Sequence, residues 1–208
     1  MNRLFTVVCF LCYGLGIFAQ QSLSDDEKLV FKQKVREKAK TTKTIKSDFT
    51  QKKHLSFLKN DIVSSGTFYF KQPNVVKWYY MKPFDYSIVF KNNKMLINDN
   101  GKKTTVNTGN NKLFKNLNHL ITNTATGELF DEENFHISFI KNDKQFIVTL
   151  RPKDVELKKY IAQFELYFGI KNYVVEQVKM IEPANDFTLI TFKNRQENTP
   201  LKDEVFTN

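Results

Sequence analysis

The spacing of hydrophobic and polar positions predicts one amphipathic helix near the start of the chain. Ser24 fits a helix N-cap, and Glu27, three residues later, fits the other half of a capping box. Acidic side chains in this first turn also suit the positive end of the helix dipole. The apolar residues that follow at helical spacing are Leu29, Val30, Phe31, Val35 and Ala39. We therefore expect an amphipathic helix from residue 24 to about Lys40.

After this helix, alternation with period two predicts a long series of strands. Before residue 110 the predicted strands are Thr44–His54, Ile62–Lys71, Val75–Met81, Tyr86–Phe90, Lys94–Asn98 and Lys102–Val106. After residue 130 they are Phe135–Ile140, Phe146–Leu150, Ile161–Phe168, Tyr173–Ile181 and Phe187–Phe192. Short turn sequences such as Asp99-Asn100-Gly101 separate them. The fold class expected is mainly β with helices (α+β), built on one large antiparallel sheet with helices on one face.

The strand series is interrupted at residues 111–129, where apolar residues again recur at helical spacing. These residues are Leu113, Phe114, Leu117, Leu120 and Ile121. A sheet of about ten or more strands tends to curl, because strand twist accumulates. If the two helical segments cover the concave side of the sheet, an apolar cavity lies between them and the sheet.

The segment Gly66 to Pro83 is rich in aromatic residues, in two extended stretches joined by Lys71-Gln72-Pro73-Asn74. Alternation places the members of each stretch on common faces. In the first stretch, Gly66, Phe68, Phe70 and Gln72 share one face, and in the second stretch Val76, Trp78 and Tyr80 share one face. This hairpin therefore presents a large apolar surface. Alternation alone is consistent with either a cavity wall or an ordinary packed core.

Residues 1–19 have the composition of a secretory signal peptide, expected to be cleaved after Ala19. Arg3 gives a basic start, and the apolar run from Leu4 to Phe18 is shorter than the roughly 20 residues that span a bilayer. The only cysteines, Cys9 and Cys12, lie inside this segment. The mature chain would therefore have no disulfide and no cysteine site. We expect an exported protein with one domain, residues 20–208.

The whole chain carries a formal net charge of +10, which becomes +9 when Arg3 is removed with the signal segment. The lysines are spread from Lys28 to Lys202 instead of forming one basic arm, which disfavours nucleic acid as a partner. A solvated surface, or transient contact with membrane surfaces or partner proteins, agrees better with this distribution.

Motifs for enzyme chemistry are missing from the sequence. His54, His119 and His136 lie in separate segments and form no His-Glu-x-x-His pattern. There is no Gly-x-Ser-x-Gly elbow and no phosphate-binding glycine loop. We expect no catalytic residue, no metal and no cofactor. A lipid-processing enzyme with a site built from distant residues stays open as an alternative, because motif reading does not detect such sites.

Three stretches together resemble the LolA family of periplasmic carriers, which move lipoproteins between the two membranes of a Gram-negative envelope. The first, Ile45 to Lys52, looks like the first-strand signature, with Phe49 and Gln51 as its characteristic members. The second is the central hairpin, with Gly66-Thr67-Phe68-Tyr69-Phe70, Pro73-Asn74, Trp78 and Pro83. The third, Phe146 to Lys153, resembles a strand that ends in a Leu-Pro-Lys type sequence.

The resemblance implies an unclosed barrel with a helical lid and a cavity that accepts acyl chains. The cavity residues it implies are Phe68, Phe70, Val76, Trp78, Tyr80, Ile88 and Phe90. The residues it implies for the lid and its contacts are Gln72, Leu113, Phe114 and Leu117. It also implies a monomeric periplasmic shuttle between an inner-membrane ABC-type release complex and an outer-membrane acceptor.

Gln72 departs from the family pattern, because the better-studied members carry arginine immediately before the hairpin proline. That arginine is thought to hold the lid, whereas glutamine lacks its charge and its five-donor fork. The resemblance therefore leaves two cargoes open. One is lipoprotein, and the other is a different lipid, a glycolipid or a lipid-like biosynthetic intermediate.

Overall fold

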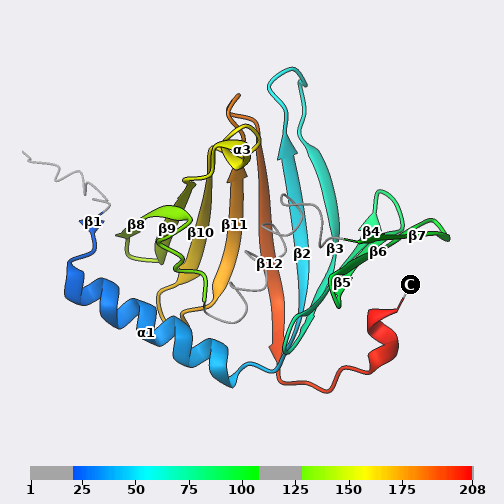
Figure 1. Cartoon of the computed structure of the whole chain (residues 1–208), viewed down its shortest axis with the longest axis horizontal. Helices are drawn as coiled ribbons and strands as arrows, with labels where there is room; N and C mark the ends of the chain where they lie inside the picture. Colours follow the sequence, from blue (N-terminus) through cyan, green and yellow to red (C-terminus); the bar gives the residue numbers. More distant parts are fainter. Residues whose placement is uncertain (1–20, 108–127, 208) are drawn as a thin grey trace, which may run out of the picture.

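A computed structural model describes residues 21–107 and 128–207 of the chain (Figure 1). The first half contains β1 (Gln21–Ser22), α1 (Asp25–Thr41), β2 (Thr44–His54), β3 (Ile62–Lys71), β4 (Val75–Lys82), β5 (Tyr86–Lys91), β6 (Lys94–Asp99) and β7 (Lys102–Asn107). The second half contains β8 (Phe135–Lys141), β9 (Gln145–Pro152), α3 (Val155–Lys158), β10 (Gln163–Gly169), β11 (Val175–Ile181), β12 (Phe187–Glu197) and the 3-10 helix η1 (Asp203–Phe206).

Within these ranges, twelve strands form one sheet in the order β1-β8-β9-β10-β11-β12-β2-β3-β4-β5-β6-β7. Every neighbouring pair is antiparallel. The strands at the two ends of this order, β1 and β7, do not pair with each other, so the sheet is not closed into a barrel. The predicted fold class, a large open antiparallel sheet with helices, is therefore confirmed.

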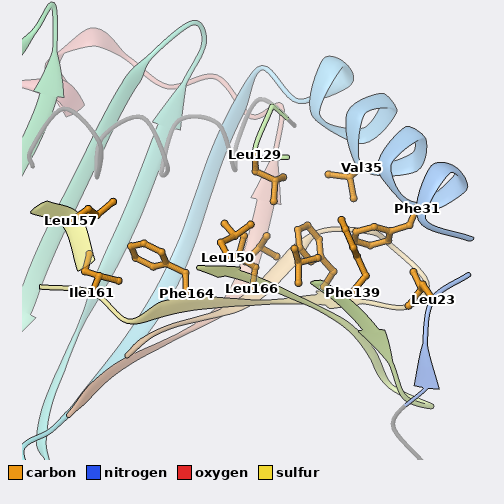
Figure 2. Close-up of a cluster of buried hydrophobic side chains, with 13 residues drawn as sticks. Leu23, Phe31, Val35, Leu129, Phe139, Leu150, Leu157, Ile161, Phe164 and Leu166 are labelled. Atoms are coloured by element: carbon orange, nitrogen blue, oxygen red, sulfur yellow. The ribbon is translucent and has the colours of Figure 1, made fainter. Parts of the chain in front are cut away.

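Helix α1 forms as the sequence predicts, because its first turn is fully capped. The Ser24 hydroxyl accepts a hydrogen bond from the Glu27 amide at 3.3 Å, and the Glu27 carboxylate accepts one from the Ser24 amide at 2.9 Å. One face of the helix, with Phe31, Val35 and Ala39, is buried. Figure 2 shows Phe31 and Val35 pointing from the helix toward the sheet. Helix α1 thus covers part of the sheet as a lid.

The predicted strands all form, but some bounds differ. The strand expected from Ile161 begins at Gln163, because the Ile161 amide bonds to the Leu157 carbonyl at the end of α3. The strand expected from Tyr173 begins at Val175, because Tyr173 lies in a turn with φ of +56°. The short elements β1, α3 and η1 were not predicted. Most of the predicted helical segment 111–129 lies outside the described residues.

Two hydrophobic clusters pack on the sheet. The first joins α1 to β8, β9 and β10 and is centred on Phe31, which is 1% exposed (Figure 2). The Phe31 ring contacts those of Phe139, Phe146 and Phe168 at centroid distances of 6.1, 4.7 and 5.2 Å. The second cluster spans β2 to β6 and includes Phe49, Phe70 and Val76.

In the part of the chain that the structure describes, no helix is long and apolar enough to cross a membrane.

Candidate hydrophobic cavity

A cavity of about 190 Å³ lies where the two hydrophobic clusters meet. Helix α1 and the adjoining Thr42 supply one wall. Strands β2, β3, β4, β10, β11 and β12 supply the remainder, together with Tyr173 and Val174 between β10 and β11. Its apolar lining residues are Val35, Ala39, Ile45, Phe68, Trp78, Phe164, Leu166, Phe168, Tyr173, Val174, Val175, Val178, Met180, Ile190 and Phe192. Lys38, Thr42, Thr188 and Arg195 add the polar groups. The lining is therefore mainly apolar, with a few polar groups, and is suited to an apolar chain.

The β3–β4 hairpin brings its predicted side chains onto one face of the sheet. Phe68 lies opposite Trp78 in the register, and Phe70 lies opposite Val76. The Phe68 and Trp78 rings pack with centroids 4.7 Å apart, and both residues line the cavity. The other five predicted cavity residues do not line it but belong to, or pack against, the adjoining cluster: Phe70, Val76, Tyr80, Ile88 and Phe90.

The predicted lid residues lie in different places. The Gln72 side chain is exposed at the β3–β4 turn, and its backbone amide donates a hydrogen bond to the Lys43 carbonyl at 2.9 Å. This bond joins the hairpin turn to the segment that follows α1. Leu113, Phe114 and Leu117 lie outside the described residues. In helix α1, by contrast, Val35 and Ala39 line the cavity.

Sequence reasoning missed the larger part of the cavity wall, which comes from β10, β11 and β12. Phe164, Leu166 and Phe168 alternate along β10, and Thr188, Ile190 and Phe192 alternate along β12. Alternation was sufficient to predict both strands. It could not show that these two strands would face α1 across a cavity, because that depends on the pairing of β12 with β2, far apart in the sequence.

An ion-pair network between α1 and β12 lies at one end of the cavity. Glu197 accepts a hydrogen bond from Lys38 Nζ at 2.5 Å on one oxygen and from Arg195 Nε at 2.7 Å on the other. The Glu197 side chain is only 18% exposed. Burial acts to raise the pKa of Glu197, but hydrogen bonds from Lys38 and Arg195 outweigh it and lower that pKa. Glu197 is therefore held as a carboxylate beside two cations.

A second polar contact lies on the β2–β4 part of the sheet. The Tyr80 hydroxyl donates a hydrogen bond to Gln51 Oε1 at 3.0 Å. Burial raises the pKa of Tyr80 to about 12, so the phenol stays neutral at ordinary pH.

Among the described residues, no group of three or more His, Cys, Asp or Glu side chains is arranged to hold a metal ion.

Comparison with known proteins relates the chain to a family of carriers. The family model described as "Outer membrane lipoprotein carrier protein LolA" matches residues 40–208. The outer-membrane lipoprotein carrier protein of Cupriavidus necator is 28% identical over 177 residues, covering 79% of this chain and 76% of that protein.

Solved structures with a similar fold include LprF from Mycobacterium bovis, with a TM-score of 0.50, 12% identity, and coverage of 90% of this chain and 99% of that chain. An uncharacterized conserved protein from Thermus thermophilus has a TM-score of 0.51 at 6% identity, covering 86% of this chain and 91% of that chain. At these identities the likeness concerns the fold alone.

Proposed function

The chain belongs to the LolA family of outer membrane lipoprotein carrier proteins, and from this premise we propose that it binds the acyl chains of lipoproteins and carries them across the periplasm. The observation that carries the proposal is the apolar cavity enclosed between α1 and the open sheet. In this role residues 1–19 act as a cleaved secretory signal. An inner-membrane ABC-type complex supplies the cargo and an outer-membrane acceptor receives it.

The volume of the cavity limits how much of an acyl chain it can hold while α1 lies against the sheet. At about 190 Å³ it is comparable to the engineered apolar cavity of roughly 150 Å³ that takes benzene. It therefore accommodates part of one acyl chain. A lipoprotein with three chains requires α1 to move away from the sheet, which enlarges the space that Val35 and Ala39 now close.

The free energy of transfer follows from the same contacts. Each methylene that leaves water stabilises the complex by about 0.8 kcal/mol. Moving α1 separates Val35 and Ala39 from the sheet, which offsets part of that gain. A carrier balanced in this way takes cargo from a weaker site and yields it to a stronger one, with no catalytic step and no cofactor.

Gln72 supports an alternative in which the cargo is another lipid, a glycolipid or a lipid-like intermediate. The family arginine would present a charge at this turn, whereas Gln72 is exposed and its backbone bonds to Lys43. In that case other contacts hold α1 against the sheet, such as the hydrogen bond from Lys38 to Glu197.

The test is to add the purified mature protein to spheroplasts that display labelled triacylated lipoprotein, and to assay the soluble fraction for a one-to-one complex. The proposal expects this complex. It also expects Phe68→Asp, which places a charge in the cavity wall, to abolish the complex. The matched control is Phe84→Asp, because Phe84 is 68% exposed and outside the cavity lining.

Because Phe68→Asp can also disturb folding, an uncharged variant accompanies it. Ala39→Leu fills space in the cavity and keeps the wall apolar. Circular dichroism and urea unfolding report whether each variant is folded. If folded Ala39→Leu and Phe68→Asp both release lipoprotein as well as the unaltered protein, the cavity is not the cargo site. If lipoprotein stays on the membrane while native mass spectrometry finds a small lipid on the protein, the alternative replaces the first proposal.

A further inference from the structure

The cavity continues into a polar pocket at its charged end. This pocket, of about 530 Å³, shares five lining residues with the cavity: Lys38, Val174, Val175, Phe192 and Arg195. Its other lining residues are Asn172, Glu176, Gln177, Thr191, Lys193, Asn194 and Glu197. An apolar compartment and a polar compartment thus adjoin, with two cationic side chains at their boundary.

The polar pocket opens where β12 leaves β11. Pairing between these strands ends at Gln177 and Thr191. Strand β12 then continues along β2 alone, as far as Glu197. Among residues 21–107 and 128–207, this extension of β12 has no hydrogen-bonded neighbour on its β11 side. The polar pocket lies in the resulting gap, beside the end of the cavity.

A β-bulge turns Arg195 toward this gap. Before the bulge, the even-numbered residues Thr188, Ile190 and Phe192 face the cavity. The register then shifts by one residue between Lys193 and Gln196, with Asn194 at φ of +52°. As a result, an odd-numbered residue, Arg195, lines the cavity. Bulges of this kind often redirect a side chain at a binding site.

The bulge is held by its own contacts. Asn194 Nδ2 donates a hydrogen bond to Asp48 Oδ2 at 2.8 Å, and Ser47 Oγ donates one to the Lys193 carbonyl at 2.8 Å. Ser47 is 1% exposed, so its hydroxyl satisfies this carbonyl away from water. The orientation of Arg195 is therefore built into the packing of β12 on β2.

Arg195 retains hydrogen-bonding capacity in this position. Its Nε bonds to Glu197, while its two terminal amino groups have no hydrogen-bond partner within residues 21–107 and 128–207. The guanidinium can therefore still donate to an anion in the pocket. The pocket lining contains three cations, Lys38, Lys193 and Arg195, against the carboxylates Glu176 and Glu197. Its formal charge is positive.

We propose that this polar pocket binds the anionic headgroup of an amphiphile whose acyl chain lies in the adjoining cavity, with Arg195 and Lys38 as the headgroup ligands. The inference rests on the proposed function, because it requires an acyl chain in the cavity. It specifies the class of cargo as a lipid with a negatively charged phosphate or carboxylate. This agrees with the alternative cargo and not with a triacylated lipoprotein anchor, which carries neither group. Glu197 limits the affinity for the anion by competing for both cations.

Trp78 provides the readout, because it lines the cavity and is the only tryptophan of the chain. A lysophosphatidylglycerol and an uncharged monoacylglycerol with the same brominated acyl chain are titrated into the mature protein. Bromine quenches tryptophan fluorescence on contact. A brominated fatty acid and its methyl ester repeat the comparison with a carboxylate in place of the phosphate.

The unaltered protein is expected to bind the anionic lysophospholipid roughly tenfold more tightly than the uncharged monoacylglycerol, because charge-assisted hydrogen bonds are the stronger class. Arg195→Gln is expected to remove this preference by weakening binding of the anionic probe. The matched control is Arg151→Gln, an exposed arginine of β9 that lines neither pocket. It should keep the preference. Lys38→Gln should weaken it, which provides a second variant if Arg195→Gln does not fold.

Glu197→Gln separates headgroup binding from a purely structural role of Arg195. If Arg195 only holds Glu197 in place, both substitutions should weaken binding of both probes alike. If Arg195 binds the headgroup, Glu197→Gln should strengthen binding of the anionic probe, because the carboxylate no longer competes.

The remaining outcomes are distinct. Equal quenching by the lysophosphatidylglycerol and the monoacylglycerol, unchanged in Arg195→Gln, overturns the headgroup assignment and leaves the carrier proposal standing. If neither probe quenches Trp78, the cavity does not take acyl chains and the proposed function fails. A preference confined to the phosphate probe or to the carboxylate probe identifies which anion the pocket prefers.

Discussion

The rings of Phe49 on β2 and Tyr80 on β4 pack edge to face with centroids 5.0 Å apart, although β3 lies between these strands. Gly66 on β3 lies opposite both residues in the register. Because glycine has no side chain, the two rings can meet above it. A Cβ built at Gly66 would lie 1.9 Å from the Tyr79 carbonyl oxygen.

Gly66→Ala is therefore expected to destabilise the protein by about 1–3 kcal/mol, because the backbone of β4 must shift to admit a methyl group. Urea unfolding followed by Trp78 fluorescence measures the change. The comparison variant is Gly101→Asn, at a turn position with φ of +91° and open space around it. Because side chains rarely adopt this backbone region, the second variant is strained but meets no neighbouring atom, so it should lose less stability than Gly66→Ala. Equal loss in both variants would contradict the steric explanation.

Phe31→Ala should lower the free energy of unfolding by about 3–5 kcal/mol, since Phe31 is 1% exposed and centred among the rings of the first cluster. The loss should appear in urea unfolding together with increased binding of a hydrophobic dye. Leu29→Ala on the same helix is the control, because Leu29 is 69% exposed. That change should stay within about 0.5 kcal/mol. Similar effects of the two substitutions would mean that α1 is not anchored through Phe31.

The capping carboxylate Glu27 gives a pH dependence with a definite sign. Hydrogen bonds from Lys141 and from Ser24 lower the pKa of Glu27 from 4.5 to about 2. The ionised group therefore stabilises the folded state above pH 4.5, and this contribution is lost as the pH falls toward 2.

Glu27→Gln keeps an amide that can complete the capping box but removes the charge. We expect it to lower the urea midpoint at about pH 7 and to make little difference below pH 2, where Glu27 itself becomes protonated. Asp26→Asn, in the same first turn, is the control for a general loss of negative charge. A midpoint difference that stays constant across this pH range would contradict the assignment to Glu27 ionisation.

The C-terminal element η1 packs against β4, and its Phe206 is 2% exposed. Lys71 Nζ bonds to Asp203 at 2.7 Å, and Lys77 Nζ bonds to the Thr207 carbonyl at 3.1 Å, which adds two polar contacts to the same segment. Phe206→Ala should release this segment and speed tryptic cleavage after Lys202 by roughly tenfold or more, because cleavage follows the population of the open form. The control is Phe84→Ala, since Phe84 is 68% exposed. Unchanged cleavage in Phe206→Ala would show that the polar contacts alone hold the segment.

The sequence determined the elements whose causes are local. The capping box at Ser24 and Glu27 specifies the start of α1, and turn residues such as Asn100 and Gly101 separate strands whose alternation is plain. The aromatic hairpin was also identified from its sequence, and two of its predicted residues, Phe68 and Trp78, line the cavity.

Tertiary structure decided which apolar faces enclose space and which pack solidly. Phe70 and Val76 follow the same alternation as Phe68, yet they are fully buried beside the cavity, because enclosure depends on where α1 and β12 meet the sheet. The charged end of the cavity was not predictable for a related reason. Arg195 faces inward only because β12 bulges against β2, and a one-residue register shift reverses alternation without a clear mark in the sequence.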